Sequence, residues 1–233
     1  MQSTWAIIAA RMGSSRLPGK ALADICGKPC LERIVERVRL AKSLDGVCVA
    51  TTYRREDRAI RDLANAIGVG IYQGPESDVR ARILEAAQII PADRIVFING
   101  DSPLTDPAII NRTVAFCTED VDYVSSHHGT WCGYPDGFSV EAFWRRGLET
   151  MIEDDRAARE HVTLSFYDRR EWEMGVVTPQ GGLAPPNLHL SLDTAADLEL
   201  LRDIFSRLPE GFSYEDVMAL LRSDPELLRR ATR

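Results

Sequence analysis

The sequence predicts an α/β fold with a mostly parallel sheet and helices on both of its faces. Two observations support this prediction. Short apolar runs bounded by Gly, Asp or Pro alternate with longer amphipathic segments, and the 233 residues contain no internal repeat or low-complexity tract. Strands that alternate with helices form βαβ units with right-handed crossovers, so the strands should run parallel. The chain is long enough to bury a proper hydrophobic core.

In the first half of the chain, the predicted strands are rich in Val, Ile and Ala. They are Trp5–Ala10, Val47–Thr51, Val69–Tyr72, Arg94–Asn99 and Val121–Ser125. The segments between them place apolar residues on one helical face, and the last begins with an Asp N-cap followed by Pro at the first helical position. These predicted helices are Leu31–Leu40, Glu56–Ile67, Asp78–Ile90 and Pro107–Cys117.

After residue 125 the pattern loosens, and long loops separate the predicted elements. We expect strands at Phe138–Phe143, Trp172–Val177 and Leu188–Leu192. The expected helices are Ala157–Tyr167, Ala195–Arg207 and Tyr214–Arg230, the last with caps at Ser213 and Asp224. Because no linker interrupts the chain, residues 1–233 should form one domain.

The charge of the chain is negative overall and positive at its start. The net charge is −7, which argues against a polynucleotide partner because affinity for phosphate backbones needs a basic surface. Residues 1–46 hold eight basic and four acidic side chains, a net +4, and the remaining residues carry −11. A small anionic ligand near the N-terminus explains this distribution, and two solvated helix faces explain it equally well.

Neither membrane insertion nor metal-binding cysteines are indicated. No apolar run approaches the roughly 18 residues of a membrane span. The run Trp5–Ala10 lacks a preceding basic region and is too short for a signal-peptide core, so we expect a cytoplasmic protein. Cys26 and Cys30 have no second Cys or His pair at zinc-site spacing, and we interpret the five cysteines as buried free thiols.

A loop rich in Gly, Ser and Arg directly follows the first predicted strand. Ligands of open α/β sheets bind beyond the carboxyl ends of strands, where this loop begins. Gly13 and Gly19 allow close approach to a phosphate, and Arg11, Arg16 and Lys20 can neutralise its charge. The spacing fits neither a Walker A loop nor a G-x-G-x-x-G fingerprint. The loop is therefore a weak sign of phosphate binding, and a basic surface turn is the alternative.

Two acidic residues follow predicted strands at the same edge of the sheet. Asp101 comes after Arg94–Asn99, and Asp193 comes after Leu188–Leu192. Magnesium is held in proteins by one or two carboxylates together with phosphate oxygens and water, so this pair could bind Mg²⁺. Alternatively, Asp101 caps a turn and Asp193 starts the following helix. With the basic loop, the pair permits attack on a nucleoside triphosphate by positioning and charge stabilisation.

The segment Ile7–Lys20 resembles the signature of the CMP-sugar cytidylyltransferases, which include the CMP-KDO and acylneuraminate cytidylyltransferases. It is most similar to the spore-coat polysaccharide branch. Further similar segments follow in order along most of the chain. They are Gly27–Pro29, Val49–Thr52, Gly74 with Asp78, Val79 and Arg82, Asn99–Leu104, Tyr134–Gly137, Arg159–Thr163 and Leu192–Thr194. Each is weak alone, and the ordered set is specific. Ala9 departs from the Gln common in that branch, which puts a contact near the base or ribose in doubt.

The resemblance implies a three-layer Rossmann-like fold of the nucleotide-diphospho-sugar transferase (GT-A) type. It implies a Mg²⁺-dependent enzyme that transfers CMP from CTP to the anomeric hydroxyl of an acidic sugar, for surface polysaccharide or glycan biosynthesis. Residues 1–125 would bind the nucleotide, residues 126–193 the acceptor sugar, and residues 194–233 would form C-terminal helices. The resemblance also suggests a homodimer.

The resemblance also assigns candidate site residues. Those for the nucleotide are Ala10, Arg11, Met12, Gly13, Ser14, Arg16, Lys20, Thr51, Thr52, Gly74, Asp78, Arg82 and Asp101. Of these, Arg11, Lys20 and Asp101 would take part in catalysis, and Asp101 with Asp193 would hold Mg²⁺. Those for the acceptor are Tyr134, Asp136, Glu141, Arg159 and His161. Arg159 and His161 are the candidates for gripping a carboxylate, and a helix-face ion pair and a core histidine are their alternatives.

Three other functions stay open at this point. A nucleotidyltransferase of the same fold could act on a sugar phosphate or a phosphonate. A nucleotide-sugar-dependent glycosyltransferase shares this type of sheet, although Asp101-Ser102-Pro103 lacks the second acid of its common Asp-x-Asp motif. A nucleotide-sensing module would keep only the binding loop. No nucleic-acid or membrane partner is expected.

Overall fold

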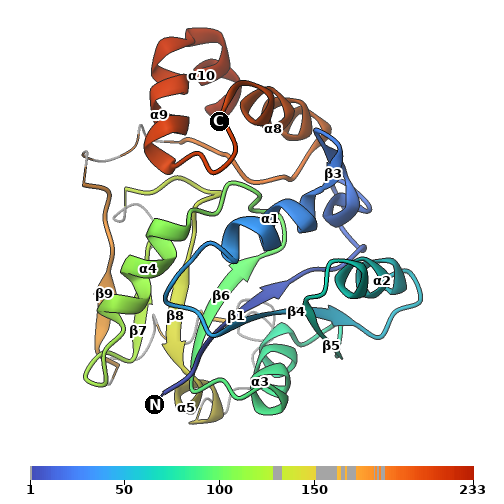
Figure 1. Cartoon of the computed structure of the whole chain (residues 1–233), viewed down its shortest axis with the longest axis vertical. Helices are drawn as coiled ribbons and strands as arrows, with labels where there is room; N and C mark the ends of the chain where they lie inside the picture. The colour runs from blue at the N-terminus through green and yellow to red at the C-terminus, as the bar shows by residue number, and fades with distance from the viewer. Residues whose placement is uncertain are drawn as a thin grey trace.

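A mixed seven-stranded sheet runs through the molecule, with helices packed on both faces (Figure 1). The computed structural model describes residues 2–127, 133–150, 162–163, 166, 172–180, 182, 184 and 187–233. The strand order is β5-β4-β1-β6-β8-β7-β9. This arrangement confirms the predicted three-layer α/β fold.

The strands of the sheet are mostly parallel. They are β1 (Thr4–Ala9), β4 (Gly46–Thr52), β5 (Gly70–Gly74), β6 (Arg94–Asn99), β7 (Tyr123–Ser125), β8 (Glu141–Trp144) and β9 (Met174–Val176). β1 pairs in parallel with both β4 and β6, while β8 runs antiparallel between β6 and β7. A separate two-stranded hairpin joins β2 (Asp24–Ile25) to β3 (Lys28–Pro29). The carboxyl ends of β1, β4 and β6 therefore meet at one edge of the sheet.

The helices cover the sheet and extend beyond it at one end. They are η1 (Lys20–Leu22), α1 (Cys30–Val38), α2 (Arg58–Ala66), α3 (Val79–Ile89), α4 (Pro107–Phe116), α5 (Arg145–Thr150), α8 (Ala195–Arg207), α9 (Tyr214–Ser223) and α10 (Pro225–Ala231). The last three pack together at one end of the molecule (Figure 1). Capping boxes begin α8 at Thr194 and α9 at Ser213.

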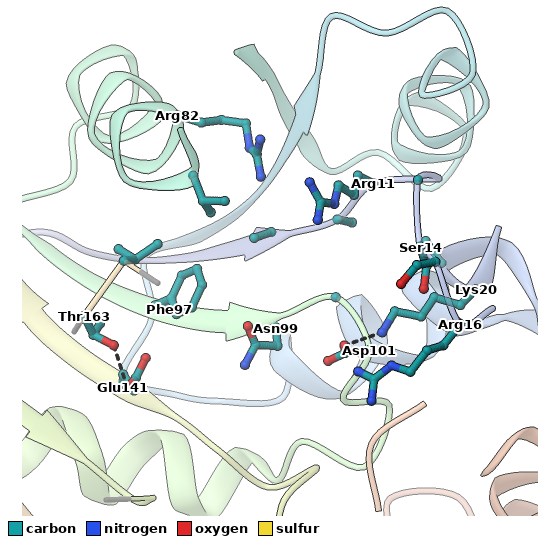
Figure 2. Close-up of a pocket in the computed structure, with 18 residues that line it drawn as sticks. Arg11, Ser14, Arg16, Lys20, Arg82, Phe97, Asn99, Asp101, Glu141 and Thr163 are labelled. Atoms are coloured by element: carbon teal, nitrogen blue, oxygen red, sulfur yellow. Dashed lines mark hydrogen bonds and ion pairs between the residues drawn. The ribbon is translucent and has the colours of Figure 1, made fainter. Parts of the chain in front are cut away.

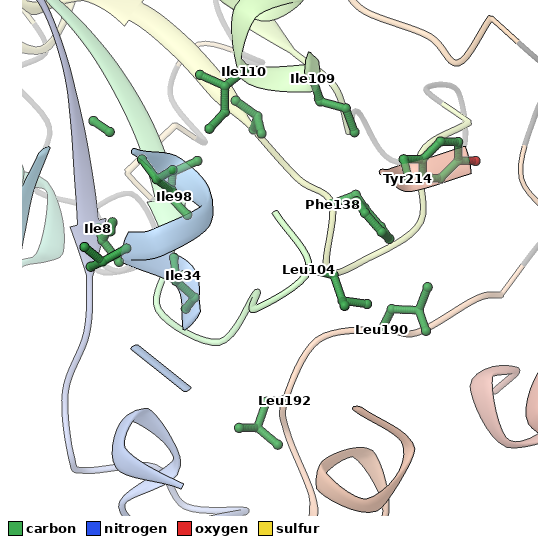
Figure 3. Close-up of a cluster of buried hydrophobic side chains, with 14 of the residues drawn as sticks. Ile8, Ile34, Ile98, Leu104, Ile109, Ile110, Phe138, Leu190, Leu192 and Tyr214 are labelled. Carbon is green, nitrogen blue, oxygen red and sulfur yellow. The ribbon is translucent and has the colours of Figure 1, made fainter. Parts of the chain in front are cut away.

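Two buried clusters lie on the two faces of the sheet. In the first, Ile8 and Ile98 of the sheet pack towards Ile34 of α1, and the cluster continues to Leu190 and Tyr214 (Figure 3). In the second, residues of the opposite sheet face pack against α3 and α5. Successive strand residues point to opposite faces, which is why neighbours in β1 and in β6 belong to different clusters. The first cluster joins the sheet to the C-terminal segment.

Some predicted elements in the second half differ from the structure. Residues 188–192 form no strand, because their backbone pairs only through isolated bridges, Asp136 to His189 and Leu188 to Thr232. By contrast, the predicted helical tail Tyr214–Arg230 is confirmed with both of its caps, since α9 begins after Ser213 and α10 begins after Asp224 with Pro225 at its first position. The predicted helix Ala157–Tyr167 lies almost wholly outside the described residues.

Two predictions about surface side chains were wrong. Cys26 is exposed at a positive φ of 51°, whereas Cys30, Cys48 and Cys117 are buried as predicted. The sequence predicts that Arg33, Arg37, Arg39 and Lys42 mostly line the outer, solvated face of the first helix. Arg37 is instead buried, and its guanidinium donates to the carbonyl oxygens of Thr105 and Phe212. Burial lowers the pKa of Arg37 to about 10, and nearby Asp106 opposes that effect. No helix in the described part of the chain is long and apolar enough to cross a membrane.

We predict that Gly100→Ala destabilises the edge of the sheet that carries the site. The N–H of Gly100 donates to the carbonyl oxygen of Ala9 at 2.9 Å, and a Cβ at position 100 would lie 2.4 Å from that oxygen. The segment after β6 must therefore move away from β1. We expect the free energy of unfolding to fall by about 1–3 kcal/mol in urea denaturation. An unchanged denaturation midpoint would contradict this close approach.

Candidate active site

A cleft of about 550 Å³ opens at the carboxyl ends of β1 and β6 (Figure 2). This is the edge at which open α/β sheets bind their ligands. Eight of the predicted nucleotide-binding residues line it: Ala10, Arg11, Gly13, Ser14, Arg16, Lys20, Arg82 and Asp101. The structure thus brings together residues from the N-terminal loop, α3 and the segment that follows β6.

The carbonyl group of Met12 holds two points of the N-terminal loop. The carbonyl oxygen of Met12 accepts hydrogen bonds from the N–H groups of Ser14 and Gly19, each at 2.9 Å. Gly19 has a φ of 76°, a left-handed conformation that glycine adopts without strain. The loop therefore closes on itself before η1, with Arg16 and Lys20 facing the cleft.

Lys20 lies between the two carboxylates that the sequence assigned to a metal. Its Nζ is 2.6 Å from Asp101 Oδ2 and 3.0 Å from Asp193 Oδ1, and Arg16 Nη2 is 2.8 Å from the same Asp193 oxygen (Figure 2 shows the Asp101 contact). Burial alone would lower the pKa of Lys20, but Asp101 and Asp193 outweigh it and raise that pKa above its ordinary value. Lys20 therefore stays protonated at neutral pH.

The chemistry of this donor set fits a hard divalent cation. Two carboxylates that share one ammonium group lie close enough to share a metal ion, and carboxylate oxygens are preferred ligands of Mg²⁺. Within the described residues no group of three His, Cys, Asp or Glu side chains could hold a metal. Among the described residues, phosphate oxygens of a bound nucleotide and water would supply the remaining ligands.

Arg82 and Arg11 lie at a second end of the cleft, with their guanidinium groups turned towards each other (Figure 2). Arg82 is 2% exposed, and its Nη1 donates to the carbonyl oxygen of Pro75 at 2.6 Å. Its Nε has no hydrogen-bond partner among the described residues. Burial, and then the charge of Arg11, lower the pKa of Arg82. A buried cation with an unused donor is suited to bind an acceptor-rich ligand.

Gly74 and Asp78 shape this end without lining the cleft. A Cβ at position 74 would lie 2.9 Å from the Arg82 side chain, so the glycine makes room for it. The carboxylate of Asp78 caps α3 by accepting the N–H of Ala81 at 2.7 Å. Their sequence-predicted roles in nucleotide binding would therefore be indirect.

Three other predicted nucleotide-binding residues lie behind the cleft wall. Thr51 and Thr52 are fully buried, and Met12 packs against the core. The Thr52 hydroxyl donates to the carboxylate of Asp57, which also accepts the N–H of Met12. Sequence reasoning missed Asp57, because a residue at a helix start is expected to cap that helix.

The remaining wall of the cleft is formed by Glu141 together with apolar and neutral residues. Glu141, the first residue of β8, accepts hydrogen bonds from the hydroxyls of Tyr123 at 2.5 Å and Thr163 at 2.9 Å. Phe97 and Asn99 of β6 lie beside it (Figure 2). Glu141 was among the predicted acceptor residues, whereas Phe97 was not predicted, and Asn99 and Thr163 were named only within family-like segments. Alternation along β6 places Phe97 and Asn99 on one sheet face, and this could have identified them as a pair.

The other predicted acceptor residues are not brought into the cleft. Tyr134 is buried, its hydroxyl accepts from Arg112 Nη1 at 3.0 Å, and burial raises its pKa although Arg112 opposes this. Asp136 accepts from Ser191 Oγ at 3.0 Å and lies 2.9 Å from His189 Nδ1. Arg159 and His161 lie outside the described residues.

We predict that Lys20→Met exposes the repulsion between Asp101 and Asp193. Without divalent cations, the free energy of unfolding should fall by about 1–3 kcal/mol, because two partly buried carboxylates lose their shared donor. Mg²⁺ should then raise the Tm of the variant more than that of the wild type. Differential scanning fluorimetry with and without Mg²⁺ measures both effects.

Lys28→Met is the matched control, because Lys28 pairs with half-exposed Glu36 away from the cleft. Its Tm should respond to Mg²⁺ as the wild type does. An equal Mg²⁺ response of all three proteins would contradict a metal site at the two carboxylates.

Comparisons with known proteins show the family to which the chain is similar. The model of the family described as Cytidylyltransferase matches residues 5–175. A solved structure of a cytidylyltransferase from Leptospira borgpetersenii serovar Hardjo-bovis superposes with a TM-score of 0.92 at 26% sequence identity, covering 100% of this chain and 99% of that one.

Two relatives among the curated proteins differ in how much of the chain they match. An uncharacterized protein of Methanocaldococcus jannaschii is 34% identical over 202 residues, covering 85% of this chain and 81% of that protein. A 3-deoxy-manno-octulosonate cytidylyltransferase of Anaeromyxobacter sp. strain K is 42% identical over 116 residues, 49% of this chain and 47% of that enzyme. The chain thus spans about half the length of that enzyme.

Proposed function

Because the chain belongs to the cytidylyltransferase family and is a nucleotidyltransferase, we propose that it transfers CMP from CTP to the anomeric hydroxyl of an acidic sugar. The observation that carries this proposal is the cleft, in which Lys20 pairs with Asp101 and Asp193, Arg16 pairs with Asp193, and Arg11 lines the other end. Three cations beside two carboxylates match a triphosphate with a bound divalent cation.

The cationic loop would hold the triphosphate, and the two carboxylates would hold Mg²⁺. When bound, Mg²⁺ supplies positive charge that offsets the charge of the phosphate oxygens. Arg11, Arg16 and Lys20 bind and orient the phosphate groups, so that the acceptor oxygen can attack the α-phosphorus in line. The bond from the α-phosphorus to the bridging oxygen breaks, pyrophosphate leaves with the electron pair, and the proton of the attacking hydroxyl passes to solvent. Such catalysis rests on positioning and electrostatic stabilisation.

The donor's cytosine and ribose would lie towards Arg82. Its unpartnered Nε is a buried donor beside the cleft, and the cytosine ring offers carbonyl and ring-nitrogen acceptors. Gly74 and Asp78 would support this contact by making room for Arg82 and by capping the helix that carries it. Thr51 and Thr52, which lie behind the cleft wall, would support nucleotide binding without touching the nucleotide.

The acceptor would occupy the wall formed by Phe97, Glu141 and Thr163. Hydroxyl groups of a sugar can donate to the Glu141 carboxylate, and its ring can pack on Phe97. Glu141 would repel an anionic group placed against it, so the acid group of the acceptor would lie away from Glu141. Arg159 and His161 stay the candidates for the acceptor's carboxylate. The product would serve surface polysaccharide or glycan biosynthesis. Residues 1–233 would form one domain, and two copies of the chain would form a homodimer.

We predict that the protein releases pyrophosphate from CTP, in preference to ATP, GTP or UTP, when Mg²⁺ and a suitable 2-keto sugar acid are supplied. A panel of eight- and nine-carbon acids identifies the acceptor by coupled pyrophosphate detection. Asp101→Asn should lower kcat by about 100-fold or more, whereas Asp120→Asn, an exposed control, should leave it unchanged. Pyrophosphate release that needs a phosphorylated sugar would contradict the proposed acceptor.

We predict that Glu141→Gln separates the acceptor from the donor. The amide keeps the size of the side chain but removes a charge that would accept from sugar hydroxyls, so the acceptor KM should rise about tenfold. The KM for CTP should change less than twofold. Steady-state kinetics with each substrate varied in turn measures both constants. A rise confined to the KM for CTP would place Glu141 on the donor side.

A further inference from the structure

Asp57 has the position of a helix cap but does not act as one. It immediately precedes α2, yet its side chain makes no hydrogen bond to the first turn of that helix. Asp78 and Asp106, at the same position before α3 and α4, do accept N–H groups of their own helices. Asp57 is only 1% exposed, and a buried carboxylate is costly unless it is hydrogen-bonded. The groups that donate hydrogen bonds to the Asp57 carboxylate therefore indicate its structural role.

Those partners belong to two segments beside the cleft. Asp57 Oδ1 accepts the N–H of Met12 at 2.7 Å, and Oδ2 accepts the hydroxyl of Thr52. Thr52 is itself fixed, since its carbonyl oxygen accepts from Gln73 Nε2 at 3.1 Å and its hydroxyl accepts from the N–H of Arg54 at 3.1 Å. Asp57 thus ties the N-terminal loop to the rigid end of β4.

This tie completes the anchoring of the loop. The carbonyl oxygen of Met12 holds the N–H groups of Ser14 and Gly19, and Asp57 holds the N–H of Met12. Both polar backbone groups of Met12 are therefore engaged, one towards the loop and one towards β4. Loss of the carboxylate would leave a part-buried N–H without its acceptor and release the start of the loop.

The charge of Asp57 also acts on the cations of the cleft. Burial lowers the pKa of Arg82 most and the like charge of Arg11 lowers it further, whereas the charge of Asp57 raises it, as do those of Asp78 and Glu76. A negative charge behind the wall offsets the repulsion between Arg11 and Arg82 before any anionic ligand arrives. The cationic end of the cleft is thereby kept in place.

We propose that Asp57 is a positioning residue for nucleotide binding, which orders the phosphate-binding loop through the Met12 N–H and the Thr52 hydroxyl. This inference rests on the proposed function. It also gives Thr52 a role through Asp57 in place of direct contact with the nucleotide.

The test compares three variants of the full chain. Asp57→Ala removes both hydrogen bonds and the charge, and Asp57→Asn keeps an acceptor for the Met12 N–H. Asp62→Ala is the matched control, because Asp62 is an exposed acid on the same helix that pairs with Arg61. Hydrogen exchange of residues 12–20 reports loop order without nucleotide. Calorimetry with CTP and Mg²⁺ reports affinity, and steady-state kinetics separates KM from kcat.

We expect Asp57→Ala to speed amide exchange at Met12, Ser14 and Gly19 and to weaken CTP binding about 10- to 100-fold. The KM for CTP should rise more than kcat falls, and Asp57→Asn should recover most of the affinity. Asp62→Ala should match the wild type in every measurement. If Asp57→Ala does not fold, Thr52→Val should give the same changes to a smaller degree. Thr52→Ser keeps the hydroxyl and should behave as the wild type does.

Two outcomes overturn the inference while the proposed function stands. One is unchanged loop exchange in folded Asp57→Ala, and the other is faster exchange with unchanged CTP affinity. If the wild type binds another nucleoside triphosphate in place of CTP, the proposed donor fails and the variants are compared with that nucleotide. If the wild type binds none of the four nucleoside triphosphates CTP, ATP, GTP and UTP, both proposals are overturned.

Discussion

The contact of Lys20 with Asp101 and Asp193 joins three segments that are distant in the sequence. Lys20 belongs to the N-terminal loop, Asp101 follows β6, and Asp193 precedes α8. Two carboxylates at this spacing need a shared cation, because their mutual repulsion in a part-buried site would otherwise separate them. The ammonium group supplies that charge and fixes the end of the loop at the same time. The shape of this end of the cleft therefore depends on Lys20, with Arg16 as a second partner of Asp193.

The loop is consequently held at both of its ends by acidic residues. Lys20 fastens its far end to Asp101 and Asp193, and Asp57 fastens its near end through the Met12 N–H. Between these two ends, the N–H groups of Ser14 and Gly19 donate hydrogen bonds to the carbonyl oxygen of Met12. A cationic loop with fixed ends loses little conformational entropy when it binds a phosphate chain, which is the general advantage of preorganisation.

How far the sequence predicts this molecule follows from the range of the interactions involved. The strands β1, β4 and β6 were predicted within one or two residues, because short apolar runs bounded by turn residues depend only on local sequence. The loop residues that line the cleft were predicted because the loop directly follows a strand. The extended segment at residues 188–192 resembles a strand locally, but it lacks a neighbouring ladder, which only the tertiary fold decides.

The residues missed by sequence reasoning are those whose roles depend on partners far away in the chain. Asp57 lies within the predicted helix Glu56–Ile67 and has no predicted role there, because its contact with Met12 spans 45 positions. Ala9 is a second position whose interpretation depends on a residue far away in the chain. It lines the cleft, and its partner in the parallel register of β1 and β6 is Asn99, which also lines the cleft. The amide that the related branch carries at position 9 is absent here, yet the neighbouring strand presents an amide at the same edge. A departure from a motif in one strand therefore has to be judged together with the residue beside it in the sheet.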